Sequence, residues 1–565
     1  MSYDIIPETA PFSAEQRAWL NGFLAGMLGT LDDGQAQGGN AVSLAAAASA
    51  LLPPAGLPSA AQPAHDSQDS EENFPWHEPS LSSDERMALA VGRPLPQRMM
   101  AAMAQLNCGS CGYVCKTYAA ALANGSEKNL SLCSPGGSAT VKLLRKLQTE
   151  KETEKEKESA RPAASDIASF GQTAATVHDP AAHATVGSRA RPVVAKLISN
   201  TRLNGANSAK DTRHVAIDLS QTGLSYSVGD ALGILPTNCD QLVRQVCSAA
   251  GLVPQTLVVI EEQSTPLEDI LAERCLRSIP LELIERAQHR VRQRPKMNGA
   301  VAADALLVER LQKFADTEEF EQLDLCEFLE SFGPLDLLAE DFVQVLSPLR
   351  PRLYSIASSQ SQTPHEVHLT VGRVEELLRG RPRKGVASTM LADRSTAGTA
   401  LRVFVQPHHG FTIPSDPTSP VIMVGPGTGI APFMAFLQQR QFDGAEGKNW
   451  LFFGDQKREA DFLYQEQLTA WQSAGLLTRL DLAFSRDSQQ KVYVQHRMLE
   501  NGAELFNWLA SGGYFYVCGD ARRMARDVDL ALLDIVAQHG QLNADCAKKY
   551  LADMKRAKRY VCDVY

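Results

Sequence analysis

Residues 420–433 have the sequence PVIMVGPGTGIAPF, and this stretch decides the fold of the C-terminal part of the chain. An apolar strand over 421–424 leads directly into a glycine-rich turn, and the turn opens a helix. This order is typical of a dinucleotide phosphate site, because free backbone N–H groups at the helix start face the phosphates. We expect the turn residues to contact the dinucleotide; they are Gly425, Gly427, Thr428 and Gly429.

The predicted strands before and after residue 416 differ in their pattern of apolar and polar residues. Downstream, apolar segments such as NWLFFGD (449–455) and YFYVCGD (514–520) alternate with helical segments, which predicts a doubly wound α/β sheet. Upstream, HVAIDLS (214–220) and LRVFVQP (401–407) alternate apolar and polar residues, as an antiparallel β-barrel does. A helical insert is expected at about 238–340.

The chain before residue 191 differs from the rest in composition. Residues 13–31 have apolar side chains at helical spacing, which predicts a helix that docks on a partner or packs on its own domain. Two linkers rich in Ala, Ser and Pro flank a small α-rich unit with four cysteines. We expect this domain order: a docking helix at 1–31, a disordered linker at 32–83, a cysteine unit at 84–147, a charged helix and linker at 148–190, a barrel domain at 191–415 and an α/β domain at 416–565.

Bulk composition excludes several classes of protein. The chain has 565 residues and a net charge of −10, so it lacks the basic field of a nucleic-acid-binding protein. No apolar stretch reaches the roughly 20 residues that a membrane span needs. The N-terminus, MSYDIIPETAPF, has no signal-peptide pattern, which indicates a cytoplasmic protein. In that compartment the 11 cysteines predict a metal or redox site rather than disulfides.

Two motifs in the barrel region suit a flavin. In RLYSIASS (352–359), an arginine can pair with a pyrophosphate, a tyrosine can lie on the isoalloxazine ring, and a serine can bond the flavin N5 region. GVAST (385–389) is a small-residue turn that opens a helix and follows two basic residues. Ordinary barrel packing and a generic helix cap are the alternatives for each motif taken alone.

Three further motifs in the α/β region suit a nicotinamide cofactor. Ser485-Arg486 and the segment KVYVQ (491–495) follow a strand, where they can hold the 2′-phosphate of NADPH. Asp487 beside them makes this prediction less clear, and a solvated charged loop is the alternative. YVCGD (516–520) and the terminal DVY (563–565) complete the series; alone, Cys518 would be a buried small hydrophobic residue.

Taken in order, these motifs over about 192–565 closely resemble the ferredoxin–NADP reductase module of the diflavin reductases, nearest to the flavoprotein subunit family of NADPH-dependent sulfite reductases. Val228 before Gly229-Asp230 and Cys562 before Asp563 depart from the usual pattern and leave the chemistry intact. By this resemblance, the residues that contact FAD are Arg352, Leu353, Tyr354, Ser355, Thr370, Val371, Gly372, Gly385, Val386, Ala387 and Ser388. Those that contact NADPH are Ser485, Arg486, Lys491, Val492, Tyr493, Val494, Gln495 and Asp527.

The resemblance also implies a catalytic set. Tyr565 stacks on the flavin and moves to admit the nicotinamide, while Ser355, Cys518 and Asp563 position and polarise the hydride transfer. In that family an FMN-binding flavodoxin-like domain precedes the module. Residues 32–190 have no strand and phosphate loop of that kind, so we expect FAD and no FMN.

Four cysteines occur where the FMN domain would be. Cys108, Cys111, Cys115 and Cys133 have the spacing C-x2-C-x3-C-x17-C, with Gly109 and Gly112 between them, which suits a 4Fe-4S cluster. The block closely resembles the 4Fe-4S domain of the Rnf complex B subunit, which usually has one more residue between the second and third cysteines. A structural zinc site is the alternative.

The sequence thus predicts an NADPH-dependent reductase that passes electrons from NADPH through FAD and a 4Fe-4S cluster to a haem partner, most simply the sirohaem subunit of an assimilatory sulfite reductase. The enzymatic alternative is the same relay feeding a nitrate or nitrite reductase, another haem protein or ferredoxin. An alternative of another class is a non-catalytic assembly subunit with structural zinc.

Overall fold

The computed structural model describes residues 76, 81–159 and 186–565, with gaps at 106–112, 114, 126, 128–129, 131, 134–135, 261, 296–299, 315–316, 318–319, 321, 334, 409 and 522. All of them lie in the unit Phe74–Tyr565. The helix predicted over 13–31, most of both predicted linkers, and Cys108 and Cys111 lie outside the described residues.

The domain predicted as a barrel is a six-stranded antiparallel sheet with strand order β6-β3-β10-β1-β2-β7. Side chains alternate between core and water: Ala195 and Leu197 are buried, whereas Lys196 between them is exposed and Val194 before them is 63% exposed. A bridge between Ile356 and Leu369 joins the two ends of the sheet, so the predicted antiparallel barrel is confirmed. The strands are β1 (Val193–Arg202), β2 (Thr212–Asp218), β3 (Ala231–Leu235), β6 (Arg352–Ser355), β7 (Glu366–Gly372) and β10 (Ala400–Gln406).

A helical insert separates β3 from β6. Its core is apolar, and the Phe314 ring contacts those of Phe328 and Phe332 with centroids 5.5 and 5.0 Å apart. A capping box between Asp324 and Glu327 fixes the start of one helix. The elements are α7 (Asp240–Ala250), β4 (Leu257–Ile260), β5 (Gln263–Pro266), α8 (Leu267–Ala272), α9 (Leu281–Arg292), α10 (Ala300–Phe314), α12 (Leu325–Phe332) and α13 (Ala339–Val345).

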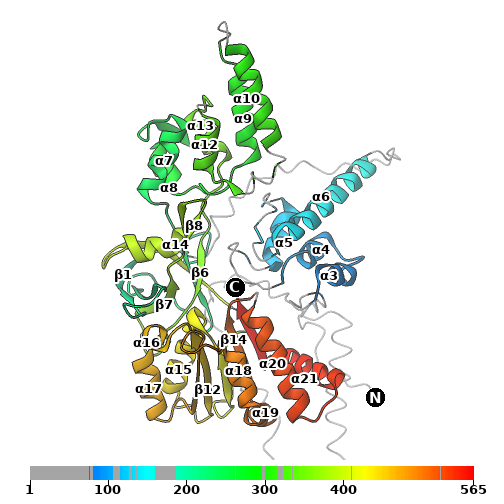
Figure 1. Ribbon diagram of the computed structural model, residues 1–565, viewed down its shortest axis with the longest axis vertical. Coiled ribbons are helices and arrows are strands. Elements are labelled where there is room, and N and C mark those ends of the chain that lie inside the picture. Colours follow the sequence, from blue (N-terminus) through cyan, green and yellow to red (C-terminus); the bar gives the residue numbers. More distant parts are fainter. Residues whose placement is uncertain are drawn as a thin grey trace, which may run out of the picture. The chain divides into compact units, whose positions relative to one another are not determined.

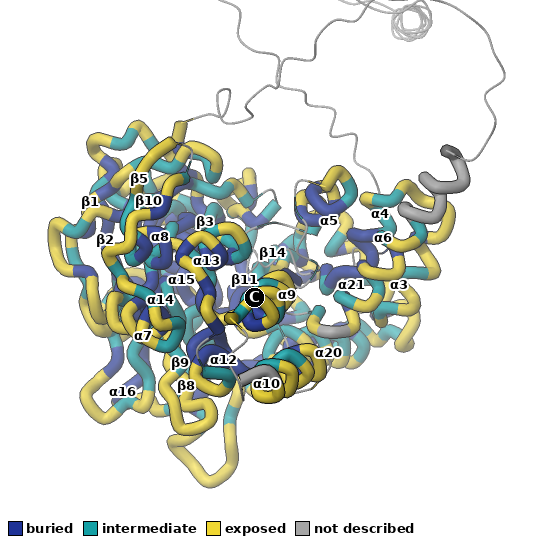
Figure 2. Tube along the Cα trace, turned by 90° about the horizontal axis from the view of Figure 1, so that it is seen from above, coloured by how far each residue is buried: buried dark blue, intermediate teal, exposed yellow. Residues whose placement is uncertain are grey.

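Between β7 and β10 the chain forms a hairpin and a short helical turn. The hairpin strands are exposed almost along their whole length (Figure 2). The elements are β8 (Glu375–Leu378), β9 (Arg381–Lys384), α14 (Val386–Thr389) and η2 (Met390–Arg394).

The C-terminal domain is the predicted doubly wound α/β fold, with a parallel sheet of order β13-β12-β11-β14-β15 (Figure 1). Alternate residues of the fully buried β11 pack into different cores: Met423 faces one cluster and Ile422 the other. Helices therefore cover both faces of the sheet. The strands are β11 (Val421–Val424), β12 (Asn449–Asp455), β13 (Arg479–Phe484), β14 (Tyr514–Gly519) and β15 (Tyr560–Val564). The helices are η3 (Gly427–Ile430), α15 (Ala431–Phe442), α16 (Arg458–Asp461), α17 (Gln465–Ser473), α18 (Val494–Glu500), α19 (Gly502–Ala510), α20 (Met524–His539) and α21 (Ala544–Arg556).

The cysteine unit is α-rich. Its small core includes Met99, Tyr118, Leu122 and Leu144. The buried Thr140 hydroxyl donates to the carbonyl of Ala102 over 2.9 Å. The helices are α3 (Ser83–Leu89), α4 (Leu95–Ala101), α5 (Cys115–Asn124) and α6 (Gly137–Ser159). Across the described ranges, every helix is too short or too polar to cross a bilayer.

Polar contacts join the barrel to the α/β domain. The amide of Asn204 donates to the buried Asp461 carboxylate over 2.9 Å. The Tyr464 hydroxyl lies 2.7 Å from the Thr370 hydroxyl and 3.0 Å from Nδ1 of His214. Because these groups come from both domains, the relative placement of the barrel and the α/β sheet depends on them.

His214 makes the stability of this contact depend on pH. Burial, assisted by the neighbouring His368, lowers the pKa of His214 from 6.5 to about 4, so the folded protein holds the ring neutral. The unfolded chain gains the proton below about pH 6.5, so this contribution is complete above that pH and is lost as the pH falls towards 4. We expect a loss of about 2 kcal/mol in the free energy of unfolding between about pH 7.5 and about pH 5.

Urea denaturation at the two pH values measures this loss. His214→Gln keeps a polar group near Tyr464 but cannot titrate, so its midpoint should change less with pH than that of the wild type. His289→Gln, an exposed position on α9, should behave like the wild type. An unchanged pH dependence in His214→Gln would contradict this assignment.

Candidate active site

The predicted flavin-contacting strand is β6, at one end of the barrel sheet. Leu353, Tyr354 and Ser355 are half-buried, and Tyr354 packs on the barrel core. β6 pairs with β3, where a Cβ on Gly233 would meet the Phe404 ring at 2.2 Å. The absence of a side chain there allows the barrel wall behind the flavin strand to pack tightly.

The other predicted FAD residues lie at the end of β7 and in the turn before α14. Val371 and Thr370 are buried, and a Cβ on Gly372 would contact the Thr428 methyl at 3.4 Å. The Ser388 hydroxyl accepts from the backbone N–H of Val374 at 3.1 Å, which ties the turn to the barrel. The predicted residues of this turn are Gly385, Val386, Ala387 and Ser388.

The glycine loop between β11 and α15 has no room for a side chain at Gly425 or Gly429. A Cβ on Gly425 would lie 2.5 Å from the Gly429 carbonyl oxygen, and one on Gly429 would lie 2.1 Å from that of Cys518. Gly427 has φ +59°, a conformation that favours glycine. The loop is therefore pressed against the end of β14, and the Thr428 hydroxyl lies 2.9 Å from that of Tyr565.

The four residues predicted to catalyse hydride transfer come together. Ser355 Oγ donates to Asp563 Oδ2 over 2.8 Å, and Cys518 Sγ lies 3.8 Å from the same oxygen. Cys518 and Asp563 are register partners on the parallel strands β14 and β15. The Tyr565 N–H donates to the Gly519 carbonyl over 3.0 Å, which fixes the C-terminal residue beside the glycine loop.

The electrostatics of this group favour a neutral thiol. Burial, reinforced by the Asp563 carboxylate, raises the pKa of Cys518 well above its usual value. Partial burial also raises the pKa of Tyr565. The residue is nevertheless 43% exposed to solvent. Cys518 is therefore a hydrogen-bond donor, and Tyr565 is an accessible phenol beside it.

Sequence reasoning had not singled out His408, which lies next to this group. Its Nε2 is 4.0 Å from Asp563 Oδ1. It lies in the loop after β10, within the segment QPHHGF (406–411), which contains none of the cofactor motifs described above.

The predicted 2′-phosphate residues lie in the turn after β13 and at the start of α18. In the described part of the chain, Arg486 and Lys491 form no ion pair with a carboxylate. Asp487 accepts the Arg458 backbone N–H at 3.1 Å, so its carboxylate is engaged at the start of α16. The other members are Ser485, Val492, Tyr493, Val494 and Gln495, and Gln495 donates to Asp527 over 3.3 Å.

Two of the four predicted cluster ligands are described. Cys115 begins α5, and Cys133 is buried just before α6. A Cβ on Gly136 would lie 3.0 Å from Cys133 Sγ, so the chain there passes close to the sulfur. Burial lowers the pKa of Arg86 while both cysteines oppose that shift, so the two thiols lie near one guanidinium.

Comparisons with known families agree with this layout. A family described as "Oxidoreductase NAD-binding domain" matches residues 423–529, and one described as "FAD binding domain" matches 187–280 and 304–390. A third, described as "Putative Fe-S cluster", matches 103–135.

Curated relatives are similar over most of the chain. Sulfite reductase [NADPH] flavoprotein alpha-components are 43% identical over 392 residues in Bacillus subtilis (strain 168) and 44% identical over 405 residues in Yersinia pestis (strain Pestoides F). The alignments cover 68% and 71% of this chain, and 64% and 63% of those relatives. The matched region is thus less than two thirds of the relatives' own length.

Cofactor preference tests the placement of Arg486 and Lys491. Each can pair with the 2′-phosphate of NADPH, a charge-assisted contact of about 1.5–3 kcal/mol. We expect Arg486→Ala with Lys491→Ala to raise KM for NADPH by about tenfold or more, with little change for NADH. Steady-state reduction of ferricyanide measures the KM values for NADPH and for NADH.

Lys548→Ala with Lys549→Ala, two exposed lysines of α21, is the matched control and should leave both KM values unchanged. Equal use of NADH and NADPH by the wild type would show that this loop is not a 2′-phosphate site.

Proposed function

Because this chain is homologous over 71% of its length to a sulfite reductase flavoprotein alpha-component, we propose that it is an NADPH-dependent flavoprotein reductase that delivers electrons through an iron–sulfur centre to a haem partner. The observation that carries the proposal is the group formed by Ser355, Cys518, Asp563 and Tyr565 beside the glycine loop. It lies between the flavin strand β6 and the nicotinamide strands β14 and β15.

The chain's residues fit FAD at β6 and NADPH at the glycine loop. Bound FAD supplies the acceptor for the hydride of NADPH. Ser355 lies on β6, and its hydroxyl is held by Asp563, so it would hydrogen-bond the N5 region of a flavin bound at this strand. Tyr565 would stack on the flavin and move aside for the nicotinamide. The Asp563 carboxylate stabilises the positive charge that develops on the nicotinamide ring.

We assign a 4Fe-4S cluster to Cys108, Cys111, Cys115 and Cys133. The match to an Fe-S family, the close approach of Gly136 to Cys133, and Arg86 near Cys115 and Cys133 support this assignment. NADPH gives two electrons as hydride, whereas haem acceptors take them singly, and a 4Fe-4S cluster would pass on one electron at a time. We keep the prediction of no FMN on the sequence alone, because residues 32–190 have no apolar strand followed by a phosphate loop.

The partner of the proposed reductase is a haem-containing subunit, in the simplest case a sirohaem sulfite reductase. The similarity to sulfite reductase flavoprotein alpha-components supports a sulfite reductase subunit as the partner. A cytoplasmic location follows from the same proposal, because a reducing compartment suits thiol ligands and an iron–sulfur centre.

Flavin content tests the cofactor assignment. The purified chain should carry FAD and no FMN, because the barrel is the flavin site that the sequence and structure provide. Heat release of the flavin followed by chromatography measures both. FMN in a one-to-one ratio with the chain would mean that a flavodoxin-like site was missed.

The cluster assignment predicts a selective loss of function. Protein prepared without oxygen should contain iron and labile sulfide. Cys111→Ser should remove or cripple the cluster and abolish electron delivery to the haem partner. Bleaching of FAD by NADPH should remain normal, because that step lies in the C-terminal domains. Stopped-flow absorbance and partner reduction measure the two steps.

Cys546→Ser, at an exposed position on α21, is the matched control and should keep both steps. Zinc at full occupancy without iron would contradict the relay. A Cys111→Ser protein that reduces its partner at the normal rate would contradict it equally.

A further inference from the structure

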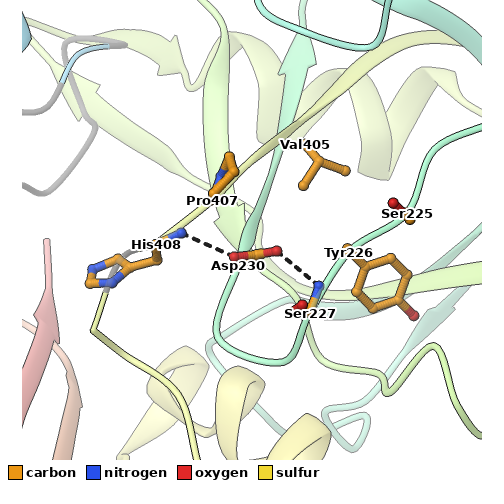
Figure 3. Close-up of a pocket in the computed structure, with 7 residues that line it drawn as sticks. All are labelled: Ser225, Tyr226, Ser227, Asp230, Val405, Pro407 and His408. Atoms are coloured by element: carbon orange, nitrogen blue, oxygen red, sulfur yellow. Dashed lines mark hydrogen bonds between the residues drawn. The ribbon is translucent and has the colours of Figure 1, made fainter. Parts of the chain in front are cut away.

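The two oxygens of the Asp455 carboxylate, at the end of β12, differ in their partners. Oδ1 accepts from the Gln456 N–H over 2.7 Å and from the Lys210 ammonium. Oδ2 is buried and has no hydrogen-bond partner in the described ranges. By contrast, Asp230, which lines a pocket of about 440 Å³ on the barrel, accepts a backbone N–H with each of its oxygens (Figure 3). The buried charge of Asp455 therefore depends on Lys210 for compensation.

The barrel places Lys210 against this carboxylate. Lys210 lies in the loop between β1 and β2. The Gly205 N–H of that loop donates to the Ala460 carbonyl of α16 over 2.7 Å, and the Asn204 amide donates to Asp461 over 2.9 Å. A lysine of one domain is thereby held over the end of a strand of the other domain.

The same ammonium lies beside the glycine loop. A Cβ on Gly427 would lie 3.8 Å from Lys210 Nζ and 3.8 Å from Asp455 Oδ2. The Lys210 side chain is 39% exposed, whereas that of Asp455 is fully buried. A ligand that approaches this loop from solvent therefore meets the lysine before the carboxylate beneath it.

The strand order puts Lys210 at the middle of the proposed dinucleotide site. The order is β13-β12-β11-β14-β15, and ligands of such sheets bind across the carboxyl ends of the strands. The predicted 2′-phosphate residues follow β13, and the hydride-transfer group includes residues of β14 and β15. NADPH that reaches from one to the other crosses the ends of β12 and β11, where Asp455 and Gly427 lie. The middle part of NADPH is its pyrophosphate.

We propose that Lys210 binds the pyrophosphate of NADPH, and that Asp455 positions its ammonium. The proposal rests on the reductase function proposed above. It assigns a barrel residue to a cofactor whose other predicted contacts lie in the α/β domain. An ammonium has three N–H donors, so Lys210 can stay on Asp455 while it donates to a phosphate oxygen. Bound NADPH then contacts both domains.

The charges around Asp455 give Lys210 a second role. Burial raises the pKa of Asp455, Lys210 opposes that shift, and the neighbouring Asp461 adds to it. Without the ammonium, a pyrophosphate at this edge would face a carboxylate and be repelled. Lys210 thus acts both as a ligand of the phosphates and as the counter-ion of Asp455, and paired variants separate the two roles.

Equilibrium binding to the FAD-loaded protein measures the ligand role. The two probes are NADP⁺ and adenosine 2′-monophosphate, which keeps the adenosine and the 2′-phosphate but has no pyrophosphate. Lys210→Gln should raise the Kd for NADP⁺ by about tenfold or more, because a charge-assisted contact is lost. The Kd for adenosine 2′-monophosphate should stay within about threefold of the wild type, a change of less than about 1 kcal/mol. Isothermal titration calorimetry gives both values.

Asp455→Asn separates the ligand from the counter-ion. In this background the carboxylate charge is gone, so Lys210→Gln can no longer leave it uncompensated. The double variant should still bind NADP⁺ about tenfold more weakly than Asp455→Asn alone. Equal Kd values for these two variants would overturn the proposal, because Lys210 would then act on NADP⁺ only by screening Asp455.

Lys548→Gln, at an exposed position on α21, is the matched control and should bind both probes as the wild type does. If Lys210→Gln weakens both probes equally, or weakens neither, the assignment of Lys210 to the pyrophosphate is overturned while the NADPH site stands. If the wild type binds neither probe, the NADPH site of the proposed reductase fails, and the assignment of Lys210 fails with it.

Hydrogen exchange gives a second readout that needs no turnover. Saturating NADP⁺ should slow the exchange of backbone amides in the loop between β1 and β2, residues 203–211, because the dinucleotide holds Lys210. Adenosine 2′-monophosphate should not protect this loop, and in Lys210→Gln neither probe should protect it. A loop that NADP⁺ leaves unprotected in the wild type would overturn the contact.

Discussion

The hydrogen bond from Ser355 to Asp563 is the contact on which the proposed chemistry depends. It spans 2.8 Å between residues 208 positions apart, one on a barrel strand and the other on the last strand of the α/β sheet. The bond forms only if β15 pairs in parallel with β14 and the barrel presents β6 to that edge. Contacts such as Asn204 with Asp461 hold the two domains in the arrangement that allows it.

Close packing of the glycine loop against the end of β14 supports the same arrangement of Ser355, Cys518 and Asp563. Gly429 lets the phosphate loop lie against the Cys518 carbonyl, so the loop, the thiol and Tyr565 form one continuous surface. A side chain at Gly429 would separate them by displacing the loop. Burial keeps Cys518 a thiol, and its proton points to the Asp563 carboxylate that also orients Ser355.

The sequence predicted what depends on local pattern. The apolar run before Gly425 and the alternation of apolar and polar residues in 214–220 have clear periods, so both types of sheet were predicted. The spacing of the four cysteines predicted the Fe-S match. The proximity of His408 to Asp563 was not predicted, because it joins a loop and a strand that only the fold brings together. The engagement of Asp487 at the start of α16 was missed for the same reason. The roles of the cofactor residues remain predictions, and two of the four cysteines lie outside the described residues.

The central claim is that electrons from NADPH cross from FAD to an iron–sulfur cluster within one chain. Anaerobic titration of the purified protein with NADPH, followed by flavin absorbance and by low-temperature EPR on the same samples, tests it most directly. The account predicts that loss of flavin absorbance is accompanied by the EPR signal of a reduced 4Fe-4S cluster. Complete bleaching of the flavin with no cluster signal at any NADPH level would contradict it.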